Sequence, residues 1–180
     1  MTKKVFKDKK LTIEPFGTRD LKCAKEYMDF INLLIEEDAK ILMNKKQTLK
    51  EEQNWVKKVA KDVKNKKRVT LVARDGNKIV ANTEIELRAY KQSHIRKFGI
   101  AIRQGYRGAG LGKYMMAEVL MLAKKNLPGL KVFWLDVFEN NKPAIALYKK
   151  MGFKIVGKIP KQIQYKGKLI GEYIMIKDAK

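Results

Sequence analysis

The sequence predicts a mixed α/β (α+β) domain with a single, mostly antiparallel sheet, and three observations point to this fold class. Strand and helix patterns follow one another in the order β-α-α-β-β-β-α-β-α-β-β. Hairpins supply antiparallel neighbours, while one helix separates two strands as a crossover connection does. With 180 residues, 45% of them hydrophobic, the chain can bury one sizeable core. We therefore expect one domain over residues 1–180, with residues 1–9 as a flexible basic N-terminus.

The first part of the chain reads as one strand followed by two helices. The run LTIEPF at 11–16 is the expected first strand. Apolar residues then recur at three- and four-residue steps, and this spacing predicts a helix. Its expected buried face consists of Leu21, Ala24, Met28, Ile31 and Ile35. Thr48 and Glu51 stand at the spacing of a capping box, which marks the start of the second helix.

The rest of the chain alternates strands with two further helices. The expected strands are a hairpin over 69–90 around an Asp-Gly pair, the runs 94–102 and 131–138, and the closing pair FKIVGKI and GEYIMIK. One helix follows a glycine-rich stretch and ends before Pro128. The other, over 140–153, carries Pro143 in its first turn, a position that proline favours.

Composition narrows the class of protein. Cys23 is the only cysteine and His94 the only histidine, so an internal disulfide, a histidine-based triad and a zinc cluster are not expected, and we predict no metal. No stretch approaches the ~20 apolar residues of a membrane span. The N-terminus leads into no apolar signal core, so we expect a cytoplasmic protein. The net charge of +22 fits a polyanion partner such as nucleic acid or the ribosome, or simply a lysine-rich solvated surface.

The run GYRGAGLGKYMM at 105–116 is the most informative stretch. Glycines let backbone amides approach a ligand, and a helix that opens directly after them aims free N–H groups at one point, so this is a candidate phosphate site. A P-loop is excluded, because Arg107 and Tyr114 stand where that motif needs Gly and Ser or Thr. The two-residue spacing of the glycines also fails the dinucleotide fingerprint.

Two motifs together resemble the GNAT-type N-acetyltransferase superfamily. The first signature, [QR]-x-x-G-x-[GA], is laid over Gly105 to Gly110, with Gly105 in place of Gln or Arg and Gln104 one position earlier. The second, N-x-x-A-x-x-L-Y-x-x-x-G-F, is matched in full by Asn141, Ala144, Leu147, Tyr148, Gly152 and Phe153. The resemblance is close over 95–158 and looser over 10–90. It implies the GNAT acyl-CoA N-acyltransferase fold, with helices on both faces of the sheet, and acetyl-CoA as co-substrate.

The resemblance also implies which residues bind coenzyme A. The backbone of Ile100, Ala101 and Ile102 would bond the pantetheine arm, while the glycine turn would hold the pyrophosphate. The residues implied for the pyrophosphate are Arg107, Gly108, Ala109, Gly110, Leu111, Gly112 and Lys113, with Arg107 and Lys113 either adding charge or remaining solvated cations. Asn141 and Ala144 of the second motif complete the cofactor set.

The implied chemistry is direct attack of a neutral amine on the thioester in a ternary complex. Tyr148 occupies the family's general-acid position, and its alternative role is a core tyrosine. Many family members place a glutamate on the strand before the glycine turn, but this sequence has none there. Glu84 and Glu86 share one face of the preceding strand and are the candidate bases, acting through water, unless they are simply solvent-exposed. His94 is a weaker candidate.

Three functions stay open at this point. The first is an N-acetyltransferase acting on a primary amine, either a small cationic amine or a protein N-terminus or lysine. The second is a coenzyme A-binding member of the fold without turnover, and the third a basic nucleic-acid-associated protein, although no nucleic-acid-recognition motif is present. Acidic residues at 36–38 and on the hairpin favour a cationic acceptor. A homodimer is possible.

Overall fold

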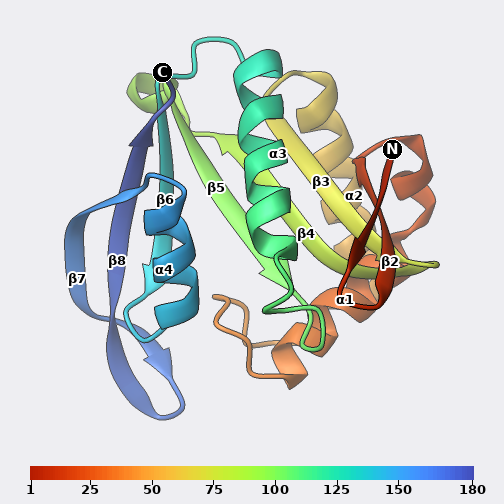
Figure 1. Cartoon of the computed structure of the whole chain (residues 1–180), viewed down its shortest axis with the longest axis horizontal. Helices are drawn as coiled ribbons and strands as arrows, with labels where there is room; N and C mark the ends of the chain where they lie inside the picture. Colours follow the sequence, from red (N-terminus) through yellow and green to blue (C-terminus); the bar gives the residue numbers. More distant parts are fainter. The chain divides into compact units, whose positions relative to one another are not determined.

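The computed structural model describes all 180 residues, Met1–Lys180, and confirms the mixed α/β class. Eight strands form a mostly antiparallel sheet in the order β1-β2-β3-β4-β5-β6-β8-β7, and four α-helices accompany it (Figure 1). The chain divides into two compact units. The first contains Met1–Glu86 and Gly99–Pro128, and the second contains Leu87–Phe98 and Gly129–Lys180. The single domain over 1–180 stays a prediction.

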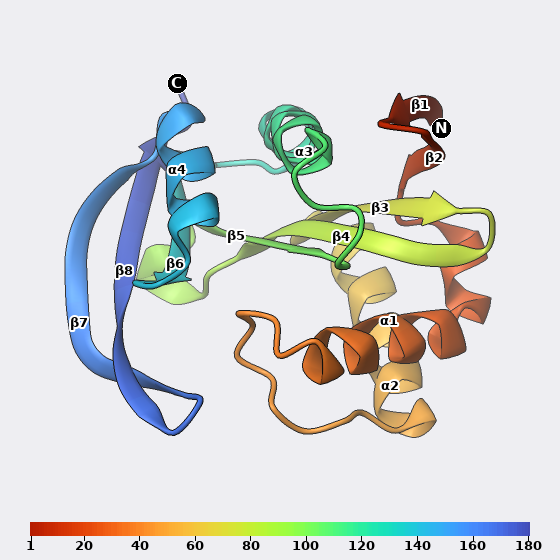
Figure 2. The ribbon, with the colours of Figure 1, turned by 60° about the horizontal axis from the view of Figure 1, so that its bottom comes forward.

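The first unit has helices on both faces of its strands. Its strands are β1 (Thr2–Phe6), β2 (Lys9–Pro15), β3 (Arg68–Asp75), β4 (Lys78–Leu87) and the end of β5 (Ile95–Ile102). The first four pair antiparallel in chain order. The helices α1 (Ala24–Glu36) and α2 (Leu49–Lys64) lie on one face of β3 and β4, and α3 (Leu111–Asn126) lies on the other (Figure 2).

The N-terminal residues form a strand that the sequence did not reveal. Residues 1–9 were expected to be a flexible tail, but Thr2–Phe6 is β1, and it pairs with β2 along its whole length. Residues 2–5 are exposed, so β1 faces solvent along most of its length. A charged, solvent-facing strand shows little apolar alternation, and this is why the pattern was missed.

Helix α1 turns a different face to the core from the one predicted. Its buried residues are Ala24, Tyr27, Phe30 and Leu34. Of the predicted face, Ala24 is buried and Ile31 packs partly buried against the core, while Leu21 is 50% exposed. Leu21 belongs to a 3₁₀ turn, Thr18–Lys22, that precedes the helix, so the predicted spacing began outside α1. Tyr27 can be buried because its hydroxyl donates to Asp20 Oδ1 over 2.8 Å.

The predicted capping box at the start of α2 is confirmed. Glu51 N donates to Thr48 Oγ1 over 3.3 Å, and Thr48 N donates to Glu51 Oε2 over 2.7 Å. The hairpin between β3 and β4 is confirmed as well, with Gly76 at φ +58° in its turn.

Replacing the capping threonine should destabilise the protein measurably. Thr48→Ala leaves the Glu51 amide without its acceptor at an exposed helix end, so we expect a loss of about 1 kcal/mol in the free energy of unfolding. Urea denaturation followed by circular dichroism measures it. The control is Lys50→Ala in the same turn, which should leave the unfolding midpoint unchanged. Equal midpoints for both variants would show that the cap contributes nothing.

The second unit combines three strands, the start of β5 and one helix. Its elements are a 3₁₀ turn (Tyr90–Gln92), β6 (Val132–Phe138), α4 (Lys142–Lys150), β7 (Lys154–Tyr165) and β8 (Lys168–Asp178). Strand β6 runs parallel to the start of β5 and antiparallel to β8, which in turn pairs antiparallel with β7. Helix α4 lies beside β6 (Figures 1 and 2). Pro143 lies in its first turn and Gly152, at φ +88°, follows its end, as predicted. None of the four helices has the length and apolar character needed to cross a bilayer.

Candidate active site

The glycine turn before α3 adopts a backbone that glycine alone accepts easily. Gly105, Gly108 and Gly110 have φ values of +82°, +73° and +86°. A Cβ added at Gly108 or Gly110 would meet no atom within 4 Å, so open space lies where a side chain would stand. A left-handed backbone with bare Cα atoms facing open space allows a ligand to approach the main chain closely.

The N-terminus of α3 meets this space with unpaired donors. The helix begins at Leu111 with Gly110 as its N-cap residue, and no side chain caps it. The amides of Leu111, Gly112 and Lys113 belong to the first turn, where backbone N–H groups have no intrahelical acceptor. The helix dipole adds partial positive charge at the same point. These groups fit a pyrophosphate such as that of coenzyme A.

The structure corrects the register of the first signature. When the pattern [QR]-x-x-G-x-[GA] is counted from Arg107 instead of Gly105, Arg107, Gly110 and Gly112 match it in full, and the pattern falls on the actual start of the helix. The substitution at Gly105 is therefore no departure from the family's motif. Because Gly108, Gly110 and Gly112 are each two residues apart, the two glycine positions of the pattern can also be placed on Gly108 and Gly110.

Arg107 is engaged by the protein itself. Its Nε donates to the Ile102 carbonyl over 2.7 Å, and its Nη2 donates to Glu37 Oε2 over 2.9 Å. The same carboxylate accepts the Gln104 amide over 3.0 Å. Arg107 thus connects the glycine turn to the end of β5 and to Glu37, the residue that follows α1. Lys113, by contrast, is solvent-exposed and makes no ion pair.

The predicted pantetheine strand has a mixed pattern of backbone partners. In β5, the Ile102 carbonyl is occupied by Arg107, and the Gly99 carbonyl accepts the Thr83 hydroxyl over 2.8 Å. Ile100, Ala101 and Ile102 are all partly exposed, and the Ala101 side chain packs against the core under α1 and α2. The peptide groups of Ile100 and Ala101 are therefore the better candidates for pantetheine contacts.

Tyr148 sits in an aromatic cluster of the second unit. It is 7% exposed and makes an edge-on ring contact with Phe98, with centroids 5.9 Å apart and planes at 82°. Burial raises the pKa of its phenol to about 12. The phenol consequently stays protonated at neutral pH and can act as a donor.

Asn141 and Ala144 open the helix that carries Tyr148. Asn141 stands at the N-cap position of α4, but its side chain makes no capping hydrogen bond. Both residues are partly exposed, and the Asn141 side-chain amide, unlike its backbone amide, which donates to the Phe138 carbonyl, is available to bond a ligand.

Glu84 and Glu86 are neither free nor fully exposed. The buried guanidinium of Arg68 donates to Glu84 Oε2 over 2.6 Å and also bonds Glu86. The side chain of Glu84 is 26% exposed and that of Glu86 39% exposed. Burial raises the pKa of Glu84, although the charge of Arg68 opposes the shift. Glu84 also lies beside β5, since a Cβ on Gly99 would stand 3.7 Å from its Cγ.

Two residues that shape this site were missed by the sequence analysis: Arg68 binds both candidate bases, and Lys9 binds the glycine turn. Glu37 was expected to attract a cationic acceptor, but its carboxylate binds Arg107 and the Gln104 amide of the glycine turn. The cross-strand register, which sets Arg68 opposite Glu86 and Thr70 opposite Glu84, was the one signal that could have revealed Arg68. No group of three or more His, Cys, Asp or Glu side chains could hold a metal ion.

The glycine turn lies at the uncapped N-terminus of α3, and the sheet is mostly antiparallel. This combination defines the class of coenzyme A-binding acyltransferase folds. The chain belongs to the Acetyltransferase (GNAT) family, whose family model matches residues 29–153. The resemblance inferred from the motifs is thereby confirmed, and acetyl-CoA is the cofactor of this family.

Relatives with assigned activities are similar to part of the chain. It is 32% identical over 85 residues to the L-amino acid N-acetyltransferase AaaT of Escherichia coli, and these residues cover 47% of this chain and 52% of the relative. Over 77 residues it is 35% identical to the spermine/spermidine N(1)-acetyltransferase of Bacillus subtilis, covering 43% and 45%. The chain thus spans about half the length of the curated relatives it matches, or less.

Solved structures match over nearly the whole chain. A GNAT-family acetyltransferase from Streptococcus pneumoniae has a TM-score of 0.81 at 27% identity, covering 93% of this chain and 98% of that one. The protein yncA of Salmonella typhimurium, solved with its cofactor acetyl-CoA, has a TM-score of 0.80 at 14% identity, covering 94% of each chain. The second likeness shows the fold alone.

Proposed function

We propose that the protein is an N-acetyltransferase that moves the acetyl group of acetyl-CoA to a primary amine by direct attack in a ternary complex. The observation that carries the proposal is the turn Arg107–Gly110 at the uncapped N-terminus of α3, with its open space at two glycine positions. Backbone amides there bind the pyrophosphate, and holding the thioester beside the amine accounts for much of the rate enhancement. The cytoplasmic location and a homodimer stay predictions.

Tyr148 supports the departing sulfur in this scheme. A thiol has a pKa of about 8.5, well below the value of about 12 for the Tyr148 phenol. Complete proton transfer from the phenol to a thiolate is therefore uphill, and a hydrogen bond to the sulfur as it gains charge is the more favourable contribution. Such a bond stabilises the transition state more than the ground state.

Glu84 is the proposed base, acting through a water molecule. Its raised pKa makes it a better proton acceptor than an ordinary glutamate, and Arg68 holds it beside Gly99 of β5. A base is needed because an ammonium group cannot attack the thioester until it loses a proton.

Removing the charge of Glu84 should slow transfer mostly above the pKa of its carboxyl group, where the wild-type side chain is ionised and can accept a proton. Glu84→Gln should lower kcat/KM roughly 10- to 100-fold at neutral pH, because a base acting through water contributes at the low end of the usual range. The acidic limb of the pH profile, where protonation of Glu84 silences the wild type, should disappear. Glu86→Gln is the matched control, since it also loses an Arg68 partner. Equal profiles for the two variants would remove Glu84 from the mechanism.

The acceptor class is a primary amine with cationic character. Relatives are named for L-amino acids, for spermine or spermidine, and for alanine of ribosomal protein bS18, and amino acids and polyamines carry such an amine. A thermal-shift measurement with acetyl-CoA, followed by a panel of these amines read by release of free thiol, tests the function. No stabilisation by acetyl-CoA, or no thiol release above hydrolysis with any amine, would count against it.

A further inference from the structure

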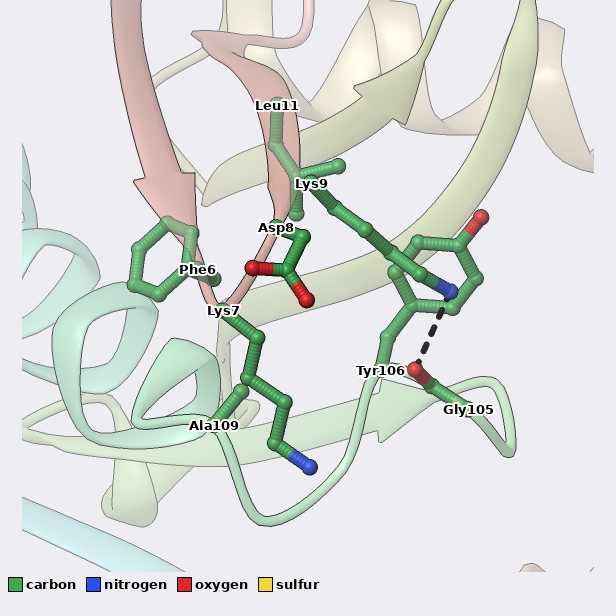
Figure 3. A pocket seen from close by; sticks show the side chains of 8 residues that line it. All are labelled: Phe6, Lys7, Asp8, Lys9, Leu11, Gly105, Tyr106 and Ala109. Carbon is green, nitrogen blue, oxygen red and sulfur yellow. Dashed lines mark hydrogen bonds between the residues drawn. The ribbon is translucent and has the colours of Figure 1, made fainter.

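The hairpin of β1 and β2 lies outside the part of the chain that the family model matches, which begins at residue 29. Its turn nevertheless reaches the glycine turn before α3. A small pocket lies between the two, lined from the hairpin by residues that include Phe6 and Lys9 and from the glycine turn by Gly105 and Tyr106 (Figure 3). All of these residues belong to the first unit.

Lys9 makes two contacts with the glycine turn. Its Nζ donates to the Gly105 carbonyl over 3.2 Å, and the same ammonium lies 3.8 Å from the centroid of the Tyr106 ring (Figure 3). The Tyr106 hydroxyl donates to Asp75 Oδ2 over 2.8 Å. The ring is therefore fixed at its far end by the β3–β4 hairpin and at its face by the cation above it.

The same hairpin also contacts the first turn of α3. The ring of Phe6 lies 5.8 Å from that of Tyr114, and the Lys4 ammonium lies 4.3 Å above the Tyr114 ring. The Tyr114 amide donates to the Gly110 carbonyl over 3.1 Å. The hairpin thus touches the chain on both sides of Gly108 and Gly110, the two glycines that face open space.

We propose that Lys9 is a positioning residue for coenzyme A, and that the β1–β2 hairpin holds the glycine turn in its phosphate-binding conformation. A turn with three glycines at positive φ has a large conformational entropy when it is free. Ordering it on binding would subtract from the affinity, and contacts that order it beforehand remove that cost. The inference rests on the proposed role of this turn as the pyrophosphate site.

Calorimetric titration of the full-length protein with coenzyme A tests the proposal without requiring an acceptor. Lys9→Met keeps the length of the side chain but loses the ammonium, so we expect Kd to rise about tenfold, which corresponds to ~1.4 kcal/mol. Lys9→Arg retains a cation above Tyr106 and should recover most of the affinity. Lys10→Met removes the same charge from an exposed neighbour and should leave Kd near the wild-type value.

Steady-state kinetics give a readout that a general loss of stability would not produce. If Lys9 acts only through binding, Lys9→Met should raise KM for acetyl-CoA and leave kcat unchanged. Circular dichroism confirms that each variant is folded at the assay temperature.

The outcomes separate this inference from the proposed function. If the wild type fails to bind coenzyme A, the pyrophosphate site itself is wrong. If the wild type binds it and Lys9→Met binds equally well, or if Lys10→Met weakens binding as much, the positioning role of Lys9 is overturned while the proposed function stands.

Discussion

Gly110→Asp should abolish measurable binding of coenzyme A while the protein remains folded. The residue has φ +86°, a conformation that costs an ordinary L-residue ~1–2 kcal/mol. Since no atom stands within 4 Å of the added Cβ, the new carboxylate would extend into the space where the pyrophosphate binds and repel it. We expect the affinity to fall by at least 10²-fold, on the order of 3 kcal/mol, and Gly108→Asp to behave alike.

Calorimetry with coenzyme A and thermal unfolding together check this result. Gly129→Asp is the matched control, because Gly129 also has a positive φ, +68°, with nothing within 4 Å of its missing Cβ, yet it lies outside the turn. It should show the same small loss of stability and an unchanged Kd. Wild-type affinity in both Gly108→Asp and Gly110→Asp would refute the assignment of the phosphate site.

Tyr148→Phe should lower kcat and leave the binding of acetyl-CoA nearly unchanged. The change removes a single hydroxyl and keeps the ring contact with Phe98, so the fold should be retained. We expect kcat to fall on the order of 10²–10³-fold, the usual effect of losing one hydrogen bond to a developing negative charge, with KM for acetyl-CoA nearly unchanged. Because the phenol has a pKa of about 12, its loss should be felt equally across the neutral range and should remove no limb below roughly pH 11.

Release of free thiol from acetyl-CoA, followed with the best amine of the panel, measures the Tyr148 effect. Tyr90→Phe serves as the control, because Tyr90 is 94% exposed and should keep full activity. A Tyr148→Phe enzyme as fast as the wild type would return this tyrosine to a purely structural role in the core.

The elements that the sequence predicted well are those with a local cause. The capping box of Thr48 and Glu51, the glycine in the β3–β4 hairpin, and Pro143 at the start of α4 each depend on residues a few positions away. The face of α1 was not predictable in this way. Its register is set by the preceding 3₁₀ turn and by the burial of Tyr27 against Asp20, which are features of the folded chain.

The same distinction between local and long-range causes applies to the candidate site. The glycine turn and Tyr148 could be identified because motifs carry them. The residues that hold the site together could not, since Lys9 lies 96 positions from Gly105 and Glu37 lies 67 positions from Gln104. Side chains that meet across such separations leave no periodic pattern in the sequence.

Some of the many lysines of this chain lie on the edge strand β7, where their charge has a role that needs no binding partner. It pairs only with β8, so its outer backbone groups form an open edge, and Ile155, Val156 and Ile159 are 38%, 54% and 38% exposed. Such an edge invites other chains to add a strand and aggregate. Lys158 and Lys161 lie on the same strand, flanking Pro160, and its register shifts between Ile159 and Ile163. Charge, a missing amide and a local irregularity are devices by which sheet proteins keep an exposed edge from pairing with other chains.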